Sequence, residues 1–205
     1  MGPTSSGHPG QHPPPPPDLP SQSLPLVNLD GPWFRVHQIT KRSVFFGTTK
    51  RNRFDDSKGT FGVLYVGESE FAAFIETFGQ ETGIRAVPKA LLNDRGMCEL
   101  VAERTLRIVD LDGPNLAHLG ADARLFAADH SVAQAWSTAL FAHPDAPDGI
   151  RYPARHDNHQ YALALYGGGR CNKLIRQKGK TRKLGAPENA ARLATWLDHY
   201  KFSLV

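Results

Sequence analysis

Apolar positions along the chain fall into short runs typical of strands and longer stripes at helical spacing. Phe61–Gly67 is apolar, rich in β-branched and aromatic residues, and has glycines at both edges, which predicts a buried strand. In the following segment, Glu68–Phe78, apolar side chains recur at i, i+3, i+4 and i+7. This spacing predicts an amphipathic helix directly after the strand.

Similar patterns predict further elements on both sides of this pair. Helices are predicted at His130–Phe141, with Asp129 or Ser131 as the N-cap, and at Pro187–Tyr200, where proline suits the first turn. Strands are predicted at Trp33–Ile39, Ile84–Val87, Thr105–Val109, Gly149–Arg155 and Tyr161–Tyr166, a helical turn at Asn115–Leu119, and a polar loop at Lys41–Lys58. Because strands and helices do not alternate regularly, we expect the α+β class: one domain of mixed small sheets with packed helices.

The N-terminal segment has a different composition. Residues 1–25 are rich in Gly, Pro, Ser and His and include five consecutive prolines, Pro13–Pro17. Such a segment has too few apolar side chains to form a core, which predicts a disordered or polyproline II tail acting as a spacer. The folded domain is therefore expected to span residues 26–205.

Composition indicates the cellular compartment and excludes several classes of functional site. Cys98 and Cys171 lie far apart and match no metal or redox spacing, which favours a reducing cytoplasm. No run approaches the roughly 20 apolar residues of a membrane span, and the N-terminus lacks the features of a secretion signal. His156 and His159 have no clear third partner, so we expect no metal site. The sequence also lacks a phosphate-binding glycine loop and a serine-hydrolase elbow.

Positive charge is concentrated in one segment. The net charge is +4, and Arg170–Lys183 contains seven basic residues and no acidic ones. Such a run is typical of nucleic-acid contact or of a solvated loop. The segment has no aromatic residues between its basic ones to stack on bases, which argues against nucleic acid as a partner. An anionic small molecule or an acidic protein is an alternative.

Four side chains indicate a possible site. Tyr65 in the predicted strand and Glu76 on the polar face of the predicted helix can flank one cleft. Arg35 lies within an apolar run, WFRVHQI, and Arg53 lies in the polar segment RNRFDD. A guanidinium in an apolar strand is unfavourable unless it meets an anion or a carboxylate. A ligand-binding cleft and a purely structural pairing of Arg35 with Glu76 are both open interpretations.

Five motifs in this order resemble the RES domain family, named for Arg, Glu and Ser. They are WFRVH with Arg35, NRFD with Arg53, GVLYVG with Tyr65, AFIETF with Glu76, and GIRYPARHD with Arg155. The resemblance implies a fold similar to ADP-ribosyltransferases. It also implies a toxin of a bacterial toxin–antitoxin pair that hydrolyses or phosphorolyses NAD⁺, or transfers ADP-ribose to a protein.

The resemblance also implies roles for individual residues. Glu76, Tyr65 and Arg35 match catalytic positions, whereas NAD⁺ binding is expected from Arg35, Arg53, Tyr65, Arg155 and His156. The implied partners are NAD⁺ as the substrate, inorganic phosphate or a protein as the acceptor, and an antitoxin protein.

One position departs from the family pattern, because Ala154 stands where the family has its serine. Losing a hydrogen bond to a charged group costs about 1.5–3 kcal/mol, which slows a reaction roughly ten- to two-hundredfold. We therefore expect a slower but active enzyme. A module that binds NAD⁺ or ADP-ribose without turnover is the first alternative, and a nucleic-acid binder using Arg170–Lys183 is the second.

Overall fold

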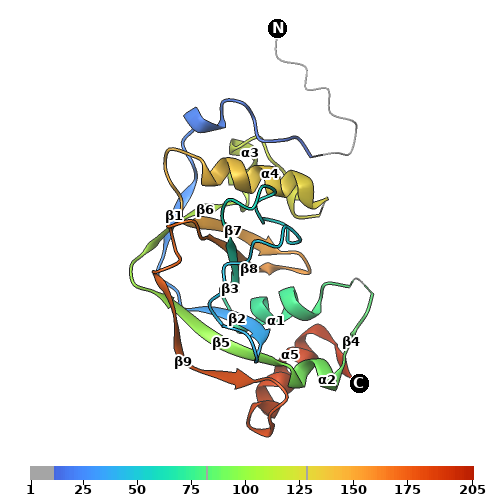
Figure 1. The fold of residues 1–205 in the computed structure, drawn as a ribbon. Helices are drawn as coiled ribbons and strands as arrows, with labels where there is room; N and C mark the ends of the chain where they lie inside the picture. Colours follow the sequence, from blue (N-terminus) through green and yellow to red (C-terminus); the bar gives the residue numbers. More distant parts are fainter. Residues whose placement is uncertain (1–11, 82, 128) are drawn as a thin grey trace.

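An eight-stranded mixed sheet forms the centre of the computed structural model, which describes residues 12–81, 83–127 and 129–205 (Figure 1). In spatial order its strands are β1 (Leu26–Leu29), β6 (Leu106–Asp110), β7 (Gly149–Ala154), β8 (Asp157–Tyr166), β3 (Val63–Gly67), β2 (Trp33–Gln38), β5 (Arg95–Ala102) and β9 (Ile175–Lys183). Neighbouring strands are antiparallel except β6 and β7. The short strands β4 (Ala86–Val87) and β10 (Ser203–Leu204) form a separate parallel pair. The expected α+β class is confirmed, although one large sheet replaces the several small ones expected.

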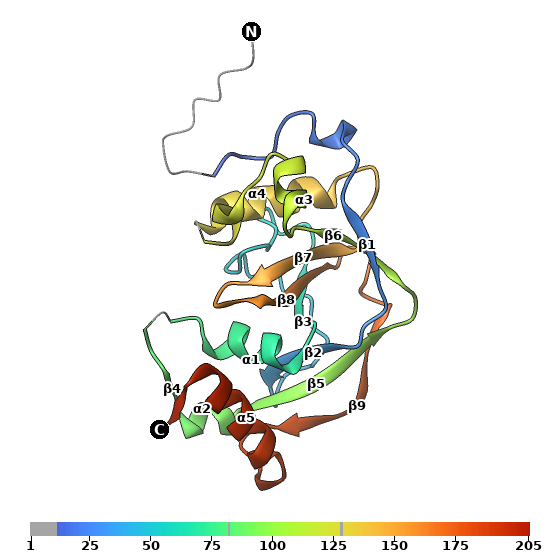
Figure 2. The ribbon, with the colours of Figure 1, turned by 180° about the vertical axis from the view of Figure 1, so that it is seen from behind.

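Helices pack in two groups, as Figures 1 and 2 show from opposite sides. One group contains α3 (Pro114–His118) and α4 (His130–Phe141), and the other contains α1 (Glu70–Phe78), α2 (Lys89–Asn93) and α5 (Ala190–Tyr200). Short 3₁₀ turns occur at Leu19–Ser21, Ala123–Phe126 and Pro187–Asn189. Helix α4 has the predicted bounds, and the Asp129 carboxylate caps it by accepting a hydrogen bond from the Ser131 amide (2.8 Å). Among the described residues, no helix combines the length and apolar character needed to cross a membrane.

Two long strands differ from the sequence-based expectation. Strand β5 was not predicted, because Glu99 interrupts its apolar run, but in the sheet this carboxylate pairs with Lys178 of β9 (3.0 Å). Strand β9 occupies much of the basic segment for which a solvated loop was one interpretation. It lies at the sheet edge and pairs on one side only, with β5. Charged side chains suit such an edge because they oppose pairing with another chain.

Residues 12–25 pack against the domain, which corrects the expected disordered tail in this part. Leu19 is 1% exposed, and the Trp136 indole of α4 donates a hydrogen bond to the Pro13 carbonyl (3.0 Å). His143 donates through Nε2 to the Leu19 carbonyl (3.1 Å). The expectation was wrong for residues 12–25 because two leucines, Leu19 and Leu24, are enough to anchor the segment. The first 11 residues of the predicted tail lie outside the described residues.

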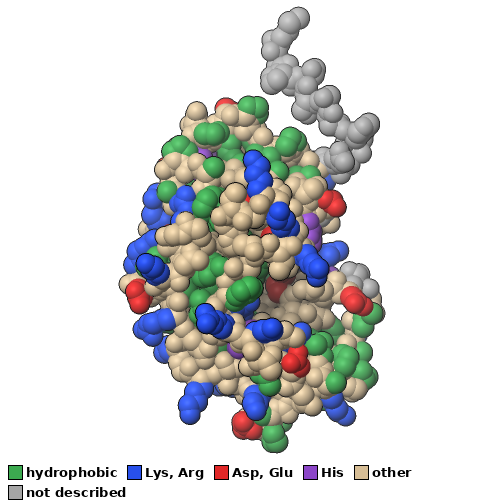
Figure 3. Space-filling model, viewed as in Figure 1, with side chains coloured by type: hydrophobic (Ala, Val, Ile, Leu, Met, Phe, Trp, Pro, Cys, Tyr) green, Lys and Arg blue, Asp and Glu red, His purple; other side chains and the backbone are tan. Residues whose placement is uncertain are grey.

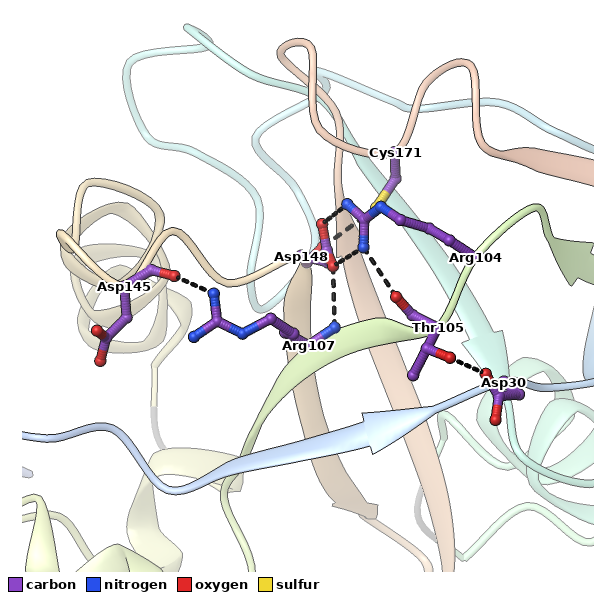
Figure 4. A network of polar contacts seen from close by, with 7 residues as sticks. All are labelled: Asp30, Arg104, Thr105, Arg107, Asp145, Asp148 and Cys171. Carbon is purple, nitrogen blue, oxygen red and sulfur yellow. Dashed lines mark hydrogen bonds and ion pairs between the residues drawn. The ribbon is translucent and has the colours of Figure 1, made fainter.

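A polar network fixes the start of β7 (Figure 4). The buried Asp148 carboxylate accepts two hydrogen bonds from the Arg104 guanidinium (2.7 and 2.8 Å) and one from the Arg107 amide (2.9 Å). Cys171 Sγ lies 3.5 Å from the Asp148 carbonyl oxygen. These contacts connect β6, the residue before β7, and the segment after β8, so they define where β7 enters the sheet.

Candidate functional site

A cavity of about 440 Å³ opens between α1, the loop before β3 and the β7–β8 hairpin. Figure 3 shows a hollow at the middle of this face with Lys or Arg side chains around it. The six residues that the sequence singled out all line the cavity: Arg35, Arg53, Tyr65, Glu76, Arg155 and His156. They come from two strands, one helix, one loop and one hairpin turn, and are brought together by the fold.

The floor of the cavity is built from small residues. Gly67 of β3 pairs with Ala162 of β8, and Ala162 pairs with Tyr152 of β7, so these three residues form one row across the sheet. A Cβ atom on Gly67 would lie 2.5 Å from the Ala73 amide nitrogen of α1. Because glycine permits this close approach, α1 packs directly over the end of β3 and brings Glu76 to the cavity.

Glu76 is anchored to the opposite wall of the cavity. Its Oε1 accepts a hydrogen bond from the Arg155 amide (3.1 Å). Burial raises the pKa of Glu76, while this amide and the charges of Arg53 and Arg155 act in the opposite direction. Within the described part of the chain, no hydrogen bond or ion pair joins Arg35 to Glu76, and the Arg35 guanidinium donates to the Ser43 carbonyl.

Guanidinium groups give the cavity a strong positive charge. Burial lowers the pKa of Arg35 and of Arg53, and the nearby charge of Arg155 lowers the pKa of Arg53 further. Arg53 Nη1 also donates to the Leu125 carbonyl (3.4 Å). Partly desolvated guanidiniums close to one another favour an anionic ligand, which offsets both their repulsion and their loss of water.

The Tyr65 hydroxyl is held by the loop that carries Arg53. It donates to Asp55 Oδ1 (3.0 Å) and accepts from the Phe54 amide (3.0 Å). Burial, followed by the Asp55 charge, raises the pKa of Tyr65 well above its ordinary value. With both functions of the hydroxyl occupied, the ring of Tyr65 is the part left to contact a ligand.

Two aspartates that sequence analysis did not single out organise this loop. Asp55 accepts hydrogen bonds from the Thr49 hydroxyl (3.0 Å) and from the amides of Arg51 and Asn52 (both 3.1 Å). Asp56 is buried, which raises its pKa, but the hydroxyl and amide of Thr60 and further donors outweigh burial and lower it to about 2. The signal for this role was present as adjacent aspartates in RNRFDDSKGT, a pattern typical of loops closed on their own amides.

Helix α4 supports the same loop with polar side chains on its buried face. Gln134 donates to the carbonyls of Lys50 (3.0 Å) and Asn52 (3.1 Å), and Ser137 donates to the Phe54 carbonyl (2.7 Å). Thr138 donates to Asp56 (2.9 Å). The position of Arg53 therefore depends on a helix that contributes to the cavity wall mainly through its first residue, His130.

The β7–β8 turn places two exposed side chains at the cavity. Arg155 and His156 form this two-residue turn, and burial followed by the charge of Arg155 lowers the pKa of His156. Ala154 is 2% exposed, between two residues that line the cavity, Pro153 and Arg155. Among the described residues, no group of three or more His, Cys, Asp or Glu side chains is arranged to hold a metal ion.

Comparisons with known proteins agree with this architecture. The chain is similar to a chain of the crystallised M. tuberculosis MbcT–MbcA toxin–antitoxin complex, with a TM-score of 0.61 and 14% identity over 86% of this chain and 92% of that one. At this identity the similarity establishes the fold. No curated protein matches the sequence. A family model of the RES domain matches residues 32–184, which include the six cavity residues and most of the described sheet. The chain therefore belongs to the RES domain family.

Proposed function

We propose that this protein is a toxin-type RES enzyme that consumes NAD⁺ by cleaving the bond between nicotinamide and ribose. The proposal is supported above all by one observation: four arginines and one half-buried glutamate, Glu76, line a single cavity. The guanidinium groups complement the anionic pyrophosphate of a dinucleotide. The carboxylate complements the ribose carbon that becomes positive as the bond to nicotinamide breaks.

The proposed chemistry needs little from the protein beyond binding and charge stabilisation. The nicotinamide ring of NAD⁺ carries a positive charge and leaves as a neutral molecule, so the leaving group is already activated. Arg35 and Arg53 bind the pyrophosphate oxygens, and the Tyr65 ring packs against the nicotinamide or its ribose. The Glu76 carboxylate accepts a hydrogen bond from the ribose 2′-hydroxyl and stabilises the oxocarbenium-like carbon.

Arg155 and His156 are proposed to guide the acceptor, since they lie in the turn at the cavity. Water, inorganic phosphate and a protein side chain are the three acceptor classes. Purified protein incubated with NAD⁺, with and without phosphate, separates them by product: ADP-ribose, ADP-ribose 1″-phosphate or a labelled protein. Unchanged NAD⁺ after long incubation in every condition would refute the enzyme proposal.

An antitoxin protein is the proposed partner, because a solved structure of similar fold is a toxin–antitoxin complex. Expression of the chain should then arrest growth of a bacterial host and lower its NAD⁺, and Glu76→Gln should restore both. Growth arrest that persists at full strength in the Glu76→Gln variant would contradict toxicity through NAD⁺.

Ala154 supports a second candidate, a module that binds NAD⁺ or ADP-ribose without turnover. This candidate predicts that the ligand raises the thermal midpoint while no nicotinamide is released. Ala154→Ser then distinguishes the two, because restoring the hydroxyl should start or accelerate release by roughly ten- to two-hundredfold if the missing hydrogen bond limits the reaction.

A further inference from the structure

A second tyrosine borders the cavity beside Tyr65. Tyr152 of β7 pairs with Ala162 of β8, which in turn pairs with Gly67 of β3. Directly paired residues point to the same face of a sheet, and so do residues two apart along one strand. Tyr152 and Tyr65 therefore lie on one face, separated by the small residues of the cavity floor.

The two tyrosines differ in what their hydroxyls do. The Tyr65 hydroxyl is hydrogen-bonded to Asp55 and to the Phe54 amide. The Tyr152 hydroxyl makes no hydrogen bond within the described part of the chain, although its side chain is buried and only 5% exposed. A polar group without a protein partner on a largely buried side chain requires an explanation, such as a bond to water or to a ligand.

The Tyr152 oxygen is also not enclosed by protein. Within residues 12–81, 83–127 and 129–205, the fully enclosed side-chain polar atoms without a partner are Gln22 Oε1 and Arg182 Nη1. The oxygen of Tyr152 therefore keeps accessible surface, and the space that Tyr152 borders is the cavity. Its ring is fixed by aromatic contacts with Phe54 (centroids 4.8 Å apart) and Phe126 (6.3 Å).

The charges around Tyr152 indicate what the hydroxyl would meet. Burial, followed by the Glu76 carboxylate, raises the pKa of Tyr152 well above its ordinary value, and Arg53 acts in the opposite direction. The phenol is therefore neutral at physiological pH and is a hydrogen-bond donor. It lies close enough to both Glu76 and Arg53 to interact with their charges. In the proposed function, Glu76 binds the ribose and Arg53 binds the pyrophosphate.

We infer that the Tyr152 hydroxyl donates a hydrogen bond to a ribose or phosphate oxygen of the bound dinucleotide. This inference deepens the proposed function and rests on it. It assigns Tyr152 as a substrate-binding residue, and it assigns the hydroxyl of Tyr65 to holding the loop.

Tyr152→Phe tests the assignment, because the change removes only the oxygen that lacks a protein partner. Binding of ADP-ribose by titration calorimetry and nicotinamide release from NAD⁺ are measured on the full chain. The dissociation constant for ADP-ribose should rise and kcat/KM should fall, each on the order of tenfold, which is the effect of one hydrogen bond to a ligand. The thermal midpoint of the free protein should stay unchanged or rise. Tyr166→Phe is the matched control, since its hydroxyl donates to the Ser137 carbonyl (3.1 Å) inside the core. That variant should lose stability and keep its affinity for ADP-ribose.

The two proposals fail in distinguishable ways. If wild type binds ADP-ribose but releases no nicotinamide, the proposed turnover is wrong and the calorimetric comparison still decides the role of Tyr152. If Tyr152→Phe binds ADP-ribose and turns over NAD⁺ as well as wild type does, the inference is overturned. A lowered thermal midpoint of free Tyr152→Phe would also contradict it, since it would show that the hydroxyl has a structural partner.

Discussion

The backbone amide of Arg155 donates to the carboxylate of Glu76 across the cavity at 3.1 Å. This contact joins the β7–β8 turn to helix α1, two elements separated by 79 positions in the chain. It also orients the carboxylate from one side, which leaves its second oxygen for a ligand. In the proposed mechanism that oxygen faces the ribose.

Replacing Glu76 by glutamine should greatly reduce NAD⁺ turnover while leaving the fold intact. The amide keeps the size and one acceptor oxygen of the carboxylate but not its negative charge, so kcat should fall about 10²- to 10³-fold. Nicotinamide release measures the effect. Glu103→Gln is the control, because Glu103 is exposed and far from the cavity residues in sequence, and it should keep full activity.

The same substitution should stabilise the folded protein at neutral pH. Burial raises the pKa of Glu76 in the folded state above its unfolded value. Because the pKa of Glu76 is higher in the folded state, its protonated carboxyl stabilises the fold fully at a pH below the unfolded-state pKa. This contribution is lost as the pH rises through the folded-state pKa. Thermal unfolding at pH 7 should therefore give a higher midpoint for Glu76→Gln than for wild type. A lower midpoint would show that the charged form is favoured by its surroundings.

Enzyme activity should fall on the acidic side at a higher pH than an exposed glutamate would produce. The proposed mechanism uses the ionised carboxylate of Glu76, whose pKa is raised by burial from its ordinary value near 4.5. A profile of kcat/KM against pH measures the acidic limb in wild type. A profile that stays flat to below pH 4.5 would exclude Glu76 as the group that must be ionised.

Asp55→Ala should weaken NAD⁺ binding without removing any cavity group. The change frees the Tyr65 hydroxyl and leaves the amides of Arg51 and Asn52 without an acceptor. We expect a loss of about 1–3 kcal/mol in the free energy of unfolding and a larger rise in KM than fall in kcat. Steady-state kinetics at several NAD⁺ concentrations separates the two. An unchanged KM would show that the loop does not position Arg53 for binding.

Asp148→Ala should destabilise the domain strongly. Arg104 and the Arg107 amide lose a shared partner that is itself only 4% exposed. Removing one member of a buried ionic network costs about 3–5 kcal/mol, and the partial exposure of Arg104 places this case toward the lower figure. Urea unfolding measures it, with Asp198→Ala, an exposed aspartate of α5, as the control. A loss below about 1 kcal/mol would mean that the network does not fix the start of β7.

Leu19→Ala tests whether the N-terminal segment belongs to the folded unit. Leu19 is 1% exposed in the core beside α4, so truncation should cost about 2–5 kcal/mol. Leu204→Ala, at a residue 39% exposed, should change the free energy of unfolding by less than about 0.5 kcal/mol. Equal free energies of unfolding for the two variants would show that the N-terminal segment does not contribute to the core.

The sequence predicts those elements in which apolar residues recur at the spacing of a helix or a strand. Helix α4, strand β2 and the succession of β3 and α1 follow directly from apolar spacing. Strand β5 and strand β9 were missed because Glu99 and Lys178 compensate each other only once the two strands pair. Partners distant in sequence cannot be read from periodicity.

Local patterns singled out four of the cavity residues, Arg35, Arg53, Tyr65 and Glu76, and the resemblance added Arg155 and His156. Their geometry was not predictable from either. Sequence suggested that Arg35 pairs with Glu76 or with a ligand, and the fold gives Glu76 the Arg155 amide instead. In the sequence Tyr152 is one residue of a motif, and its unpaired hydroxyl becomes evident only when β7, β8 and β3 are placed side by side. Asp55 was likewise overlooked, since an aspartate in a polar loop has no periodicity to mark it.

A time course of nicotinamide release from NAD⁺ by purified wild type, Glu76→Gln and Glu103→Gln tests the proposed cleavage most directly. We expect release by wild type and Glu103→Gln, and a rate at least about a hundredfold lower for Glu76→Gln. Equal rates in all three proteins, or no release by any, would contradict the claim that the cavity around Glu76 cleaves the dinucleotide.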